Sequence, residues 1–259
     1  MQSGFRFITG AIAALCVLYT LTASPALAQA DGDCILDHCA DKAPLQRTEA
    51  AGQSEDRRAG MPRPRGASVP GDFDFYVLSL SWSPGFCDSG GSAKARSQCE
   101  PGANLGFVVH GLWPQYERGF PSDCGPAGRW PSRIALQNVA GLYPDEGLAR
   151  YEWRKHGTCS GKSPTDYFAD VRRAREAVVI PPSFTNAREA QSWSPIDVQR
   201  AFVAANPRLR PGMMAVECTR GDLTEVRLCL SKDLREFVAC PEVSRQYCRT
   251  GNISVPPMR

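Results

Sequence analysis

A short segment, residues 151–159, carries three side chains that could act together in catalysis. It reads Tyr-Glu-Trp-Arg-Lys-His-Gly-Thr-Cys, a pattern typical of the last turns of a helix that ends at Gly157. In such a helix Glu152 and His156 share one face, with Lys155 beside them. Surface helices often carry Glu and Lys at this spacing as solvated ion pairs, so the segment alone does not establish a site.

A second segment supplies another histidine in an equally unusual context. Residues 107–115 read Phe-Val-Val-His-Gly-Leu-Trp-Pro-Gln, which places His110 after an apolar run. The chain has only three histidines, and the third, His38, lies in a polar region where we expect it to be solvated. The sequence therefore predicts that His110 and His156 form a pair.

Two imidazoles, a carboxylate and an ammonium suit proton transfer at a phosphate without a metal ion. Near neutral pH one imidazole can remove a proton while the other supplies one on the opposite side of a displacement. An ammonium can stabilise charge that develops on a phosphoryl oxygen, and a carboxyl group can hold a histidine or, when protonated, donate a hydrogen bond. We therefore expect His110 and His156 as an acid–base pair supported by Glu152 and Lys155, with no cofactor.

Other catalytic arrangements fit the sequence less well. A serine hydrolase of the nucleophile-elbow type requires Gly-x-Ser-x-Gly, whereas residues 157–160 read Gly-Thr-Cys-Ser. A cysteine protease requires a free thiol, which an even number of cysteines in an oxidising compartment disfavours. A zinc site is also disfavoured, because the sequence has no Cys-x-x-Cys pair and few histidines.

The first 28 residues are typical of a cleaved secretory signal. Arg6 precedes an apolar run over residues 11–21, and the small-residue sequence Ala-Leu-Ala ends at Ala28. Since about 20 apolar residues are needed to span a bilayer, we expect cleavage after Ala28, export to the periplasm or medium, and no membrane contact afterwards. Residues 29–71, rich in charge, Ala, Pro and Gly, are expected to form a disordered leader before one domain over 72–259.

Charge and cysteine content agree with an exported domain. Removal of Arg6 with the signal lowers the formal net charge from +3 to +2, a balance that predicts only local contact with a polyanion. Cys16 is lost as well, which leaves ten of the eleven cysteines. An even number in an exported chain predicts up to five disulfides, and Cys34 and Cys39 are close enough to close a small local loop.

Two buried strands and a helix are expected to position the candidate residues. Residues 73–80 follow a strand pattern with both faces largely covered, and residues 105–109 form a second buried strand with His110 at its end. Residues 131–140 and 145–156 are predicted helices, the second capped by Asp145 and carrying Glu152, Lys155 and His156.

The segment after His110 is predicted to be a loop. Gly111 and Pro114 interrupt the strand pattern. Trp113 and Gln115 are therefore expected just beyond the strand, where binding sites are commonly built.

Two more helices and a hairpin complete the expected fold. Ser163 begins a helix whose aromatic residues enter the core, and Ser194 begins another that Asn206 and Pro207 close. Residues 225–230 and 236–240 are predicted to form an antiparallel hairpin that a Cys229–Cys240 bridge could cross-link. The prediction is an α+β domain, with helices packed on a central antiparallel sheet and disulfides that staple it.

The two histidine segments resemble the active-site segments of the ribonuclease T2 family, which are secreted or vacuolar endoribonucleases. Both segments occur in the family's order, and further similarity extends over roughly residues 72–248. The resemblance implies that His156 takes the proton from the ribose 2′-hydroxyl and that His110 protonates the leaving 5′-oxygen. It also implies that Glu152 and Lys155 stabilise the transition state.

The resemblance further implies the substrate and the products. Single-stranded RNA would be cleaved to a 2′,3′-cyclic phosphate and then to a 3′-phosphate, without a metal ion. DNA would be inert, because the attacking 2′-hydroxyl belongs to RNA. We expect a monomer whose partner is its RNA substrate.

Substrate-binding residues follow from matching positions. Trp113 matches a residue that stacks on a base, a contact worth ~1–3 kcal/mol, although packing in the core is the alternative role for this tryptophan. Gln115 could contact a base edge, and Tyr116 or Phe120 could supply a second aromatic face. Because an aromatic face accepts every base, we expect low base specificity.

Tyr151 departs from the family's usual histidine, which helps to bind phosphate. Tyrosine keeps a hydroxyl donor but cannot become a cation, so we expect weaker phosphate binding with activity retained, or a tyrosine that merely packs. Tyr151 and the long leader also motivate an alternative function, a non-catalytic RNA-binding or toxin-like protein on the same fold. The intact acid–base residues argue against that alternative.

The resemblance also implies a disulfide pattern. Three pairs match the family, and two more follow by exclusion among the remaining cysteines. The five pairs are Cys124–Cys159, Cys218–Cys248, Cys229–Cys240, Cys87–Cys99 and Cys34–Cys39.

Overall fold

Strand β1 (Phe75–Trp82) lies inside the sheet and is buried along its whole length. In the computed structural model, which describes residues 68–125 and 130–259, it pairs antiparallel with β2 (Phe107–Gln115) and with β5 (Asp222–Ser231). One face of β1 contributes to the main core and the other to a smaller core around Cys229. The predicted strand with both faces covered is confirmed.

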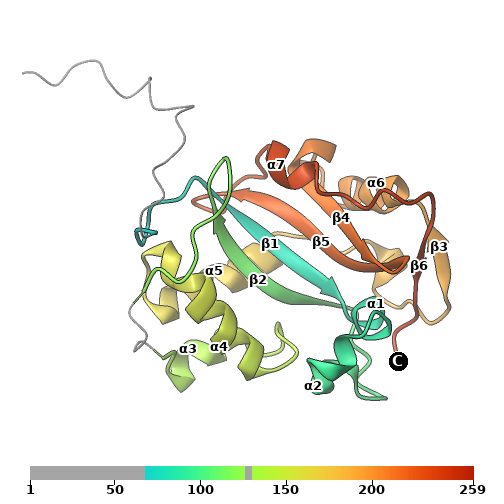
Figure 1. Cartoon of the computed structure of the whole chain (residues 1–259), viewed down its shortest axis with the longest axis horizontal. Coiled ribbons are helices and arrows are strands. Elements are labelled where there is room, and N and C mark those ends of the chain that lie inside the picture. The colour runs from blue at the N-terminus through green and yellow to red at the C-terminus, as the bar shows by residue number, and fades with distance from the viewer. Residues whose placement is uncertain (1–67, 126–129) are drawn as a thin grey trace, which may run out of the picture. The chain divides into compact units, whose positions relative to one another are not determined.

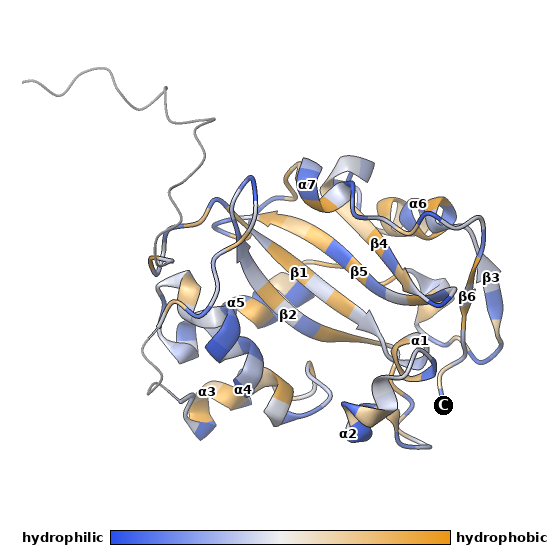
Figure 2. Cartoon of the chain, viewed as in Figure 1, coloured by the Kyte–Doolittle hydropathy of each residue, from blue (hydrophilic) through white to orange (hydrophobic). Residues whose placement is uncertain are grey.

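Three shorter strands complete the sheet. They are β4 (Met214–Thr219), β6 (Ile253–Val255) and β3 (Gln191–Trp193). The strand order is β2-β1-β5-β6-β3, with β4 also paired to β5 (Figure 1). Only the contact between β5 and β6 is parallel, so the expected antiparallel sheet is confirmed in its central part. Figure 2 shows the hydrophobic segments that run along β1, β4 and β5.

Helices pack against the apolar faces of the sheet. α4 (Glu146–Lys155) and α5 (Pro164–Glu176) pack against β2, α3 (Arg133–Gln137) packs on α5, and α6 (Pro195–Ala205) packs against β4 (Figure 1). The shorter elements are α1 (Ser83–Asp88), α2 (Arg96–Cys99), α7 (Pro241–Ser244), η2 (Gly91–Ala93), η3 (Gly157–Ser160), η4 (Pro182–Phe184) and η5 (Pro211–Met213).

The predicted helix starts are confirmed by their caps. The side chains of Asp145, Ser163 and Ser194 each accept a hydrogen bond from the backbone N–H three residues later, which satisfies one unpaired donor of the first turn. α4 therefore begins where the sequence indicated. α3 is shorter than the predicted helix over 131–140.

The prediction of a loop after His110 is wrong. β2 continues through Gly111 and Pro114 to Gln115, so Trp113 and Gln115 lie on the strand. Proline is tolerated there because β2 is at the edge of the sheet and its unpaired side needs no ladder N–H. The strand therefore carries His110 and Trp113 on a rigid element.

The predicted hairpin forms only in part. β5 pairs with β4 over Asp222–Leu228. The 236–240 segment contacts the end of β5 through a Leu230–Phe237 bridge, backbone hydrogen bonds to Cys229 and Ser231, and the Cys229–Cys240 disulfide. The apolar alternation of Met214 and Val216 is the signal for β4. Both residues are buried in the main core, whereas Phe237 of the later segment is only partly buried against it.

Four of the implied disulfides are confirmed. They are Cys87–Cys99, Cys124–Cys159, Cys218–Cys248 and Cys229–Cys240. The proposed Cys34–Cys39 pair, the signal over 1–28 and most of the leader lie outside the described residues. In the part that the structure does describe, the helices are too short or too polar to cross a bilayer.

Candidate active site

His110 occupies a β-bulge in β2. Ser79 of β1 lies opposite Gly111 and Leu80 lies opposite Val109, so His110 is the extra residue. A bulge bends its strand and re-aims a side chain. Here Val109 stays in the main core, while the His110 side chain is 39% exposed.

Helix α4 brings Glu152 to the same place. The Glu152 side chain is only 1% exposed, its Oε2 accepts a hydrogen bond from Trp113 Nε1 at 2.7 Å, and its Oε1 lies 3.7 Å from His110 Nε2. A Cβ atom on Gly111 would overlap both the indole nitrogen and this carboxylate. Glycine therefore permits the close approach of strand and helix that assembles the site.

His156 follows the last residue of α4. Its backbone N–H donates to the Glu152 carbonyl at 2.9 Å, which continues the helical pattern by one residue. The Trp113 ring lies near both imidazoles, with centroid distances of 5.2 Å to His110 and 5.4 Å to His156. The structure thus brings the two predicted histidines to one tryptophan.

Lys155 lies at the end of α4 and is paired with Asp123. Its Nζ donates to Asp123 Oδ2 at 2.5 Å, and the Asp123 backbone N–H donates to the Lys155 carbonyl at 2.8 Å. The adjacent Cys124–Cys159 disulfide joins the Asp123 loop to the segment after the helix. Lys155 is therefore held where the sequence predicts a fixed cation, with a partner that the sequence analysis missed.

The surroundings of His156 favour its neutral form. Burial, followed by the positive charges of Lys155 and His110, lowers the pKa of His156 to about 4. Its Nδ1 is buried and lacks a hydrogen-bond partner among residues 68–125 and 130–259. Near neutral pH this ring is unprotonated and can accept a proton.

The surroundings of His110 favour its charged form. Burial opposes the charge, but the hydrogen bond to Glu225 and the negative charges of Glu225 and Glu152 outweigh it and raise the pKa of His110. The two histidines therefore differ in the direction of their pKa shifts. One is suited to act as a base and the other as an acid.

The surroundings of Glu152 favour its protonated form. Burial raises the pKa of Glu152 to about 7, against the opposing effects of the His110 charge and the Trp113 hydrogen bond. In its protonated form this side chain can donate a hydrogen bond to a phosphoryl oxygen.

Sequence reasoning missed two charged residues of β5. Glu225 Oε1 lies 2.6 Å from His110 Nδ1, and Arg227 Nε donates to Glu225 Oε2 at 2.8 Å. The Arg227 guanidinium also lies 5.3 Å from the Trp113 ring centroid. Because side chains alternate along a strand, Glu225 and Arg227 lie on the same face of β5 as Cys229. The disulfide expected at Cys229 was the one signal in the sequence that this face is partly covered.

The predicted substrate-binding residues lie at different distances from the histidines. Phe120 is 58% exposed and its ring centroid lies 6.3 Å from that of His156. Tyr151 is exposed beneath the Arg154 guanidinium, which lies 5.4 Å from the Tyr151 ring centroid. Gln115 ends β2 opposite Phe75, several residues beyond His110.

Tyr116 is the other aromatic residue considered for base contact. It is partly buried and packs against the main core. Its backbone N–H donates to the Gly119 carbonyl in the turn that leads to Phe120. Of the two aromatic residues, Phe120 therefore offers the more exposed ring.

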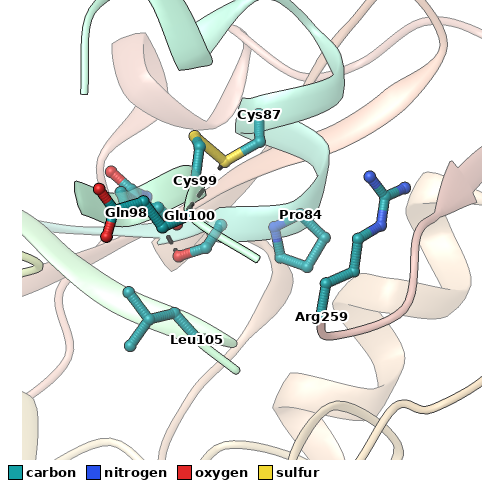
Figure 3. A pocket seen from close by; sticks show the side chains of 8 residues that line it. Pro84, Cys87, Gln98, Cys99, Glu100, Leu105 and Arg259 are labelled. Atoms are coloured by element: carbon teal, nitrogen blue, oxygen red, sulfur yellow. Dashed lines mark hydrogen bonds between the residues drawn. A yellow bond between two sulfur atoms is a disulfide. The ribbon is translucent and has the colours of Figure 1, made fainter. Parts of the chain in front are cut away.

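A small pocket between α1 and α2 contains none of the candidate catalytic or substrate-binding residues (Figure 3). Its lining residues are Ser83, Pro84, Cys87, Gln98, Cys99, Glu100, Leu105 and Arg259. Across the described ranges, His, Cys, Asp and Glu side chains form no group of three or more that could hold a metal ion.

Comparison with known proteins identifies the family. Residues 73–240 match the sequence model of the Ribonuclease T2 family. A ribonuclease from Aeromonas hydrophila is 38% identical over 177 residues, which cover 66% of this chain and 78% of that protein.

Two solved structures share the fold. An RNase-related protein from Calystegia sepium aligns with a TM-score of 0.54 at 22% identity, over 72% of this chain and 98% of the other. A mutant of ribonuclease MC1, an enzyme of bitter gourd seeds, in complex with 5′-UMP aligns with a TM-score of 0.53 at 20% identity, over 71% and 98%. With the matches in sequence, these findings show that the chain belongs to the ribonuclease T2 family and is an endoribonuclease.

Proposed function

We propose that this ribonuclease is exported and cleaves single-stranded RNA by attack of a ribose 2′-oxygen on the adjacent phosphorus. His156 removes the 2′-hydroxyl proton while the P–O2′ bond forms. The P–O5′ bond breaks, and His110 gives its Nε2 proton to the departing 5′-oxygen. The products are a 2′,3′-cyclic phosphate and a 5′-hydroxyl. Water then opens the ring to a 3′-phosphate, with His110 accepting a proton and His156 returning one.

The environments of the two histidines, which shift their pKa values in opposite directions, carry this proposal. A base must be neutral and an acid must be protonated at the same pH. The pKa of His156 is lowered to about 4 and the pKa of His110 is raised, so a neutral His156 and a protonated His110 coexist at pH values between the two pKa values. The roles that the family resemblance implied are thus supported independently by the surroundings of each ring.

Glu152 and Lys155 are proposed to stabilise the pentacoordinate transition state. Protonated Glu152 donates to a non-bridging oxygen, and the Lys155 ammonium offsets its growing negative charge. The ion pair between Lys155 and Asp123 is largely exposed, with both side chains at least a third accessible. Such pairs contribute little stability, so a phosphate can draw the ammonium away from Asp123.

Low base specificity is proposed for the aromatic contacts. The exposed Phe120 ring near His156 offers a stacking face, and stacking tolerates every base. Trp113 is surrounded by His110, His156 and Arg227. This environment supports the packing role for Trp113 alongside any contact with a base.

Cleavage in chelator tests the mechanism. The purified chain without residues 1–28 should convert RNA to fragments with 2′,3′-cyclic phosphate ends in excess EDTA and leave an all-deoxy oligonucleotide intact. His110→Ala and His156→Ala should each lower the rate by at least ~10²-fold, the lower range for acid–base groups. Loss of cleavage in EDTA, or a folded histidine variant with near-full activity, would contradict the mechanism.

Separate measurements test specificity, export and oligomeric state. The sixteen RNA dinucleotides, compared by kcat/KM, should differ only modestly.

Mass spectrometry of protein from the periplasm or medium should find Gln29 at the N-terminus, and light scattering should give a monomer. A protein retained in the cell with residues 1–28 attached would contradict the proposed export.

A further inference from the structure

Glu225 is the buried carboxylate that contacts the acid of the proposed reaction. We infer that Glu225 is a positioning residue for His110: it fixes the imidazole tautomer and orientation, and it sets the pH range over which His110 can act as an acid. This inference rests on the proposed function. It adds β5 to the two segments that the sequence identified.

Both oxygens of Glu225 are engaged. Oε1 lies 2.6 Å from His110 Nδ1, and Oε2 accepts from Arg227 at 2.8 Å. Arg227 Nη1 in turn lies 3.3 Å from Glu217 Oε1 on β4. The Glu225 side chain is only 10% exposed. The carboxylate is thus held from behind by Arg227 and presents one oxygen to the histidine.

The Glu225 carboxylate remains ionised in this arrangement. Burial opposes its charge, but the hydrogen bond and charge of His110, together with Arg227, hold the pKa of Glu225 far below its usual range. An ionised carboxylate can only accept hydrogen bonds, so His110 Nδ1 must carry a proton in both states of the ring. The exchangeable proton therefore belongs to Nε2.

His110 Nε2 points toward the reacting groups. It lies 3.7 Å from Glu152 Oε1, on the opposite side of the ring from Glu225. In cleavage the Nε2–H bond breaks and the proton moves to the 5′-oxygen, while the Nδ1–H bond to Glu225 persists. Neutral His110 then has a bare Nε2 that can take a proton from water in the second step.

The charged groups around His110 come from three segments. Glu225 and Arg227 belong to β5, Glu152 belongs to α4, and His156 follows α4. Arg227 opposes a charge on His110 and the two glutamates favour it. Of the two glutamates, Glu225 and Glu152, it is Glu225 that makes a direct hydrogen bond to the ring. Removing its charge should therefore lower the pKa of His110.

The two roles of Glu225 predict different losses for two substitutions. Glu225→Gln keeps an oxygen that can accept the Nδ1 proton but removes the charge, so the alkaline limb of kcat/KM should move to lower pH. Each unit of this shift lowers kcat/KM roughly tenfold at pH values above the limb. Glu225→Ala also removes the acceptor, so it should lower kcat at every pH. The acid limb, which depends on His156, should stay in place in Glu225→Gln.

Glu217→Gln is the matched control. It removes a carboxylate that contacts the same Arg227 but does not contact His110. Its alkaline limb should coincide with that of the unchanged protein. An equal shift in both variants would overturn the inference, because it would show a general change of charge rather than a direct contact.

Nitrogen NMR of the histidine rings tests Glu225 without RNA. In the unchanged protein, neutral His110 should carry its proton on Nδ1 and titrate above pH 6.5, and in Glu225→Gln it should titrate at lower pH. An Nε2-protonated neutral ring, or an unchanged titration in Glu225→Gln, would overturn the inference even if the protein cleaves RNA. Absence of cleavage by the unchanged protein with the expected NMR result would instead contradict the proposed function.

Discussion

At the scale of single residues, the neighbours of each histidine favour the role proposed for it. His156 lies where burial and nearby cations disfavour its charge, whereas His110 lies between two carboxylates. The same side chain can therefore serve as base and as acid within one site. In the proposed mechanism this division needs no metal ion to activate the nucleophile, because His156 would remove the 2′-hydroxyl proton directly.

The pH dependence of cleavage follows from these two environments. As pH falls through the His156 pKa of about 4, the base becomes protonated and kcat/KM should decrease. As pH rises through the His110 pKa, which is raised above 6.5, the acid loses its proton and kcat/KM should decrease again. We expect a bell-shaped profile in steady-state assays from pH 3.5 to 9.

Glu152 also titrates in this range, since its pKa is raised to about 7. Glu152→Gln keeps a hydrogen-bond donor that does not titrate, so its alkaline limb should report His110 alone. The assignment of His156 as the base would be contradicted if kcat/KM of the unchanged protein did not decrease as pH falls below 6 and had its maximum far above pH 8.

Tyr151 offers a test of phosphate binding. It is exposed on α4, four residues before Lys155, and lies close enough to influence the pKa of that ammonium, which is raised chiefly by the hydrogen bond to Asp123. Tyr151→His would add a group that can become a cation. Below pH 6.5 it should lower KM and leave kcat within a modest factor.

Tyr151→Phe is the control for this substitution. It keeps the aromatic ring beside Arg154 and removes only the hydroxyl, so it should raise KM if the hydroxyl contacts phosphate. A decrease of kcat in Tyr151→His at constant KM would show that Tyr151 affects the chemical step.

At the scale of secondary structure, the site depends on how β2 meets α4. The sequence indicated α4 well, because Asp145 caps it and its apolar residues recur at helical spacing. It did not indicate that β2 continues past His110. Gly111 and Pro114 usually interrupt strands, and only the position of β2 at the sheet edge makes them compatible with one.

The contacts of Glu225 were beyond sequence reasoning for a related cause. Glu225 is far from His110 along the chain, and the two meet only through the pairing of β1 with both β2 and β5. The motifs identify residues within a segment, whereas sheet order decides which segments become neighbours. Asp123 likewise meets Lys155 through a loop that no local pattern specifies.

Gly111→Ala tests the close approach of β2 and α4. The added Cβ would overlap the Trp113 indole nitrogen and the Glu152 carboxylate, so the strand or helix must shift. We expect a loss of about 1–3 kcal/mol in the free energy of unfolding and a decrease of kcat/KM by at least tenfold. Denaturant titration and steady-state kinetics measure the two effects.

Gly251→Ala is the matched control, because nothing lies within 4 Å of its added Cβ. It should change neither the free energy of unfolding nor kcat/KM appreciably. Unchanged kinetics in Gly111→Ala would mean that the junction of β2 and α4 can relax without moving the catalytic groups.

At the scale of the whole molecule, disulfides connect the loops that carry site residues to the sheet and helices. Cys124–Cys159 closes a separation of 35 residues and joins the Asp123 loop to the end of the catalytic helix. Cys87–Cys99 closes only 12 residues and lies beside the pocket between α1 and α2. Both constrain the unfolded chain, but only the first reaches the active site.

Removing these two disulfides separately should therefore have different consequences. Replacing Cys124 and Cys159 together by serine should lower the free energy of unfolding by about 2–4 kcal/mol and lower kcat, because the Asp123 loop no longer holds Lys155 near the transition state that it is proposed to stabilise. Replacing Cys87 and Cys99 should cost less stability, since a shorter loop loses less entropy on closure, and should leave kcat/KM unchanged. Thermal unfolding and kinetics at a temperature where both variants are folded distinguish the cases. Equal kinetic effects would show that the disulfides act only through global stability, and that the Asp123 loop does not depend on its own bridge to position Lys155.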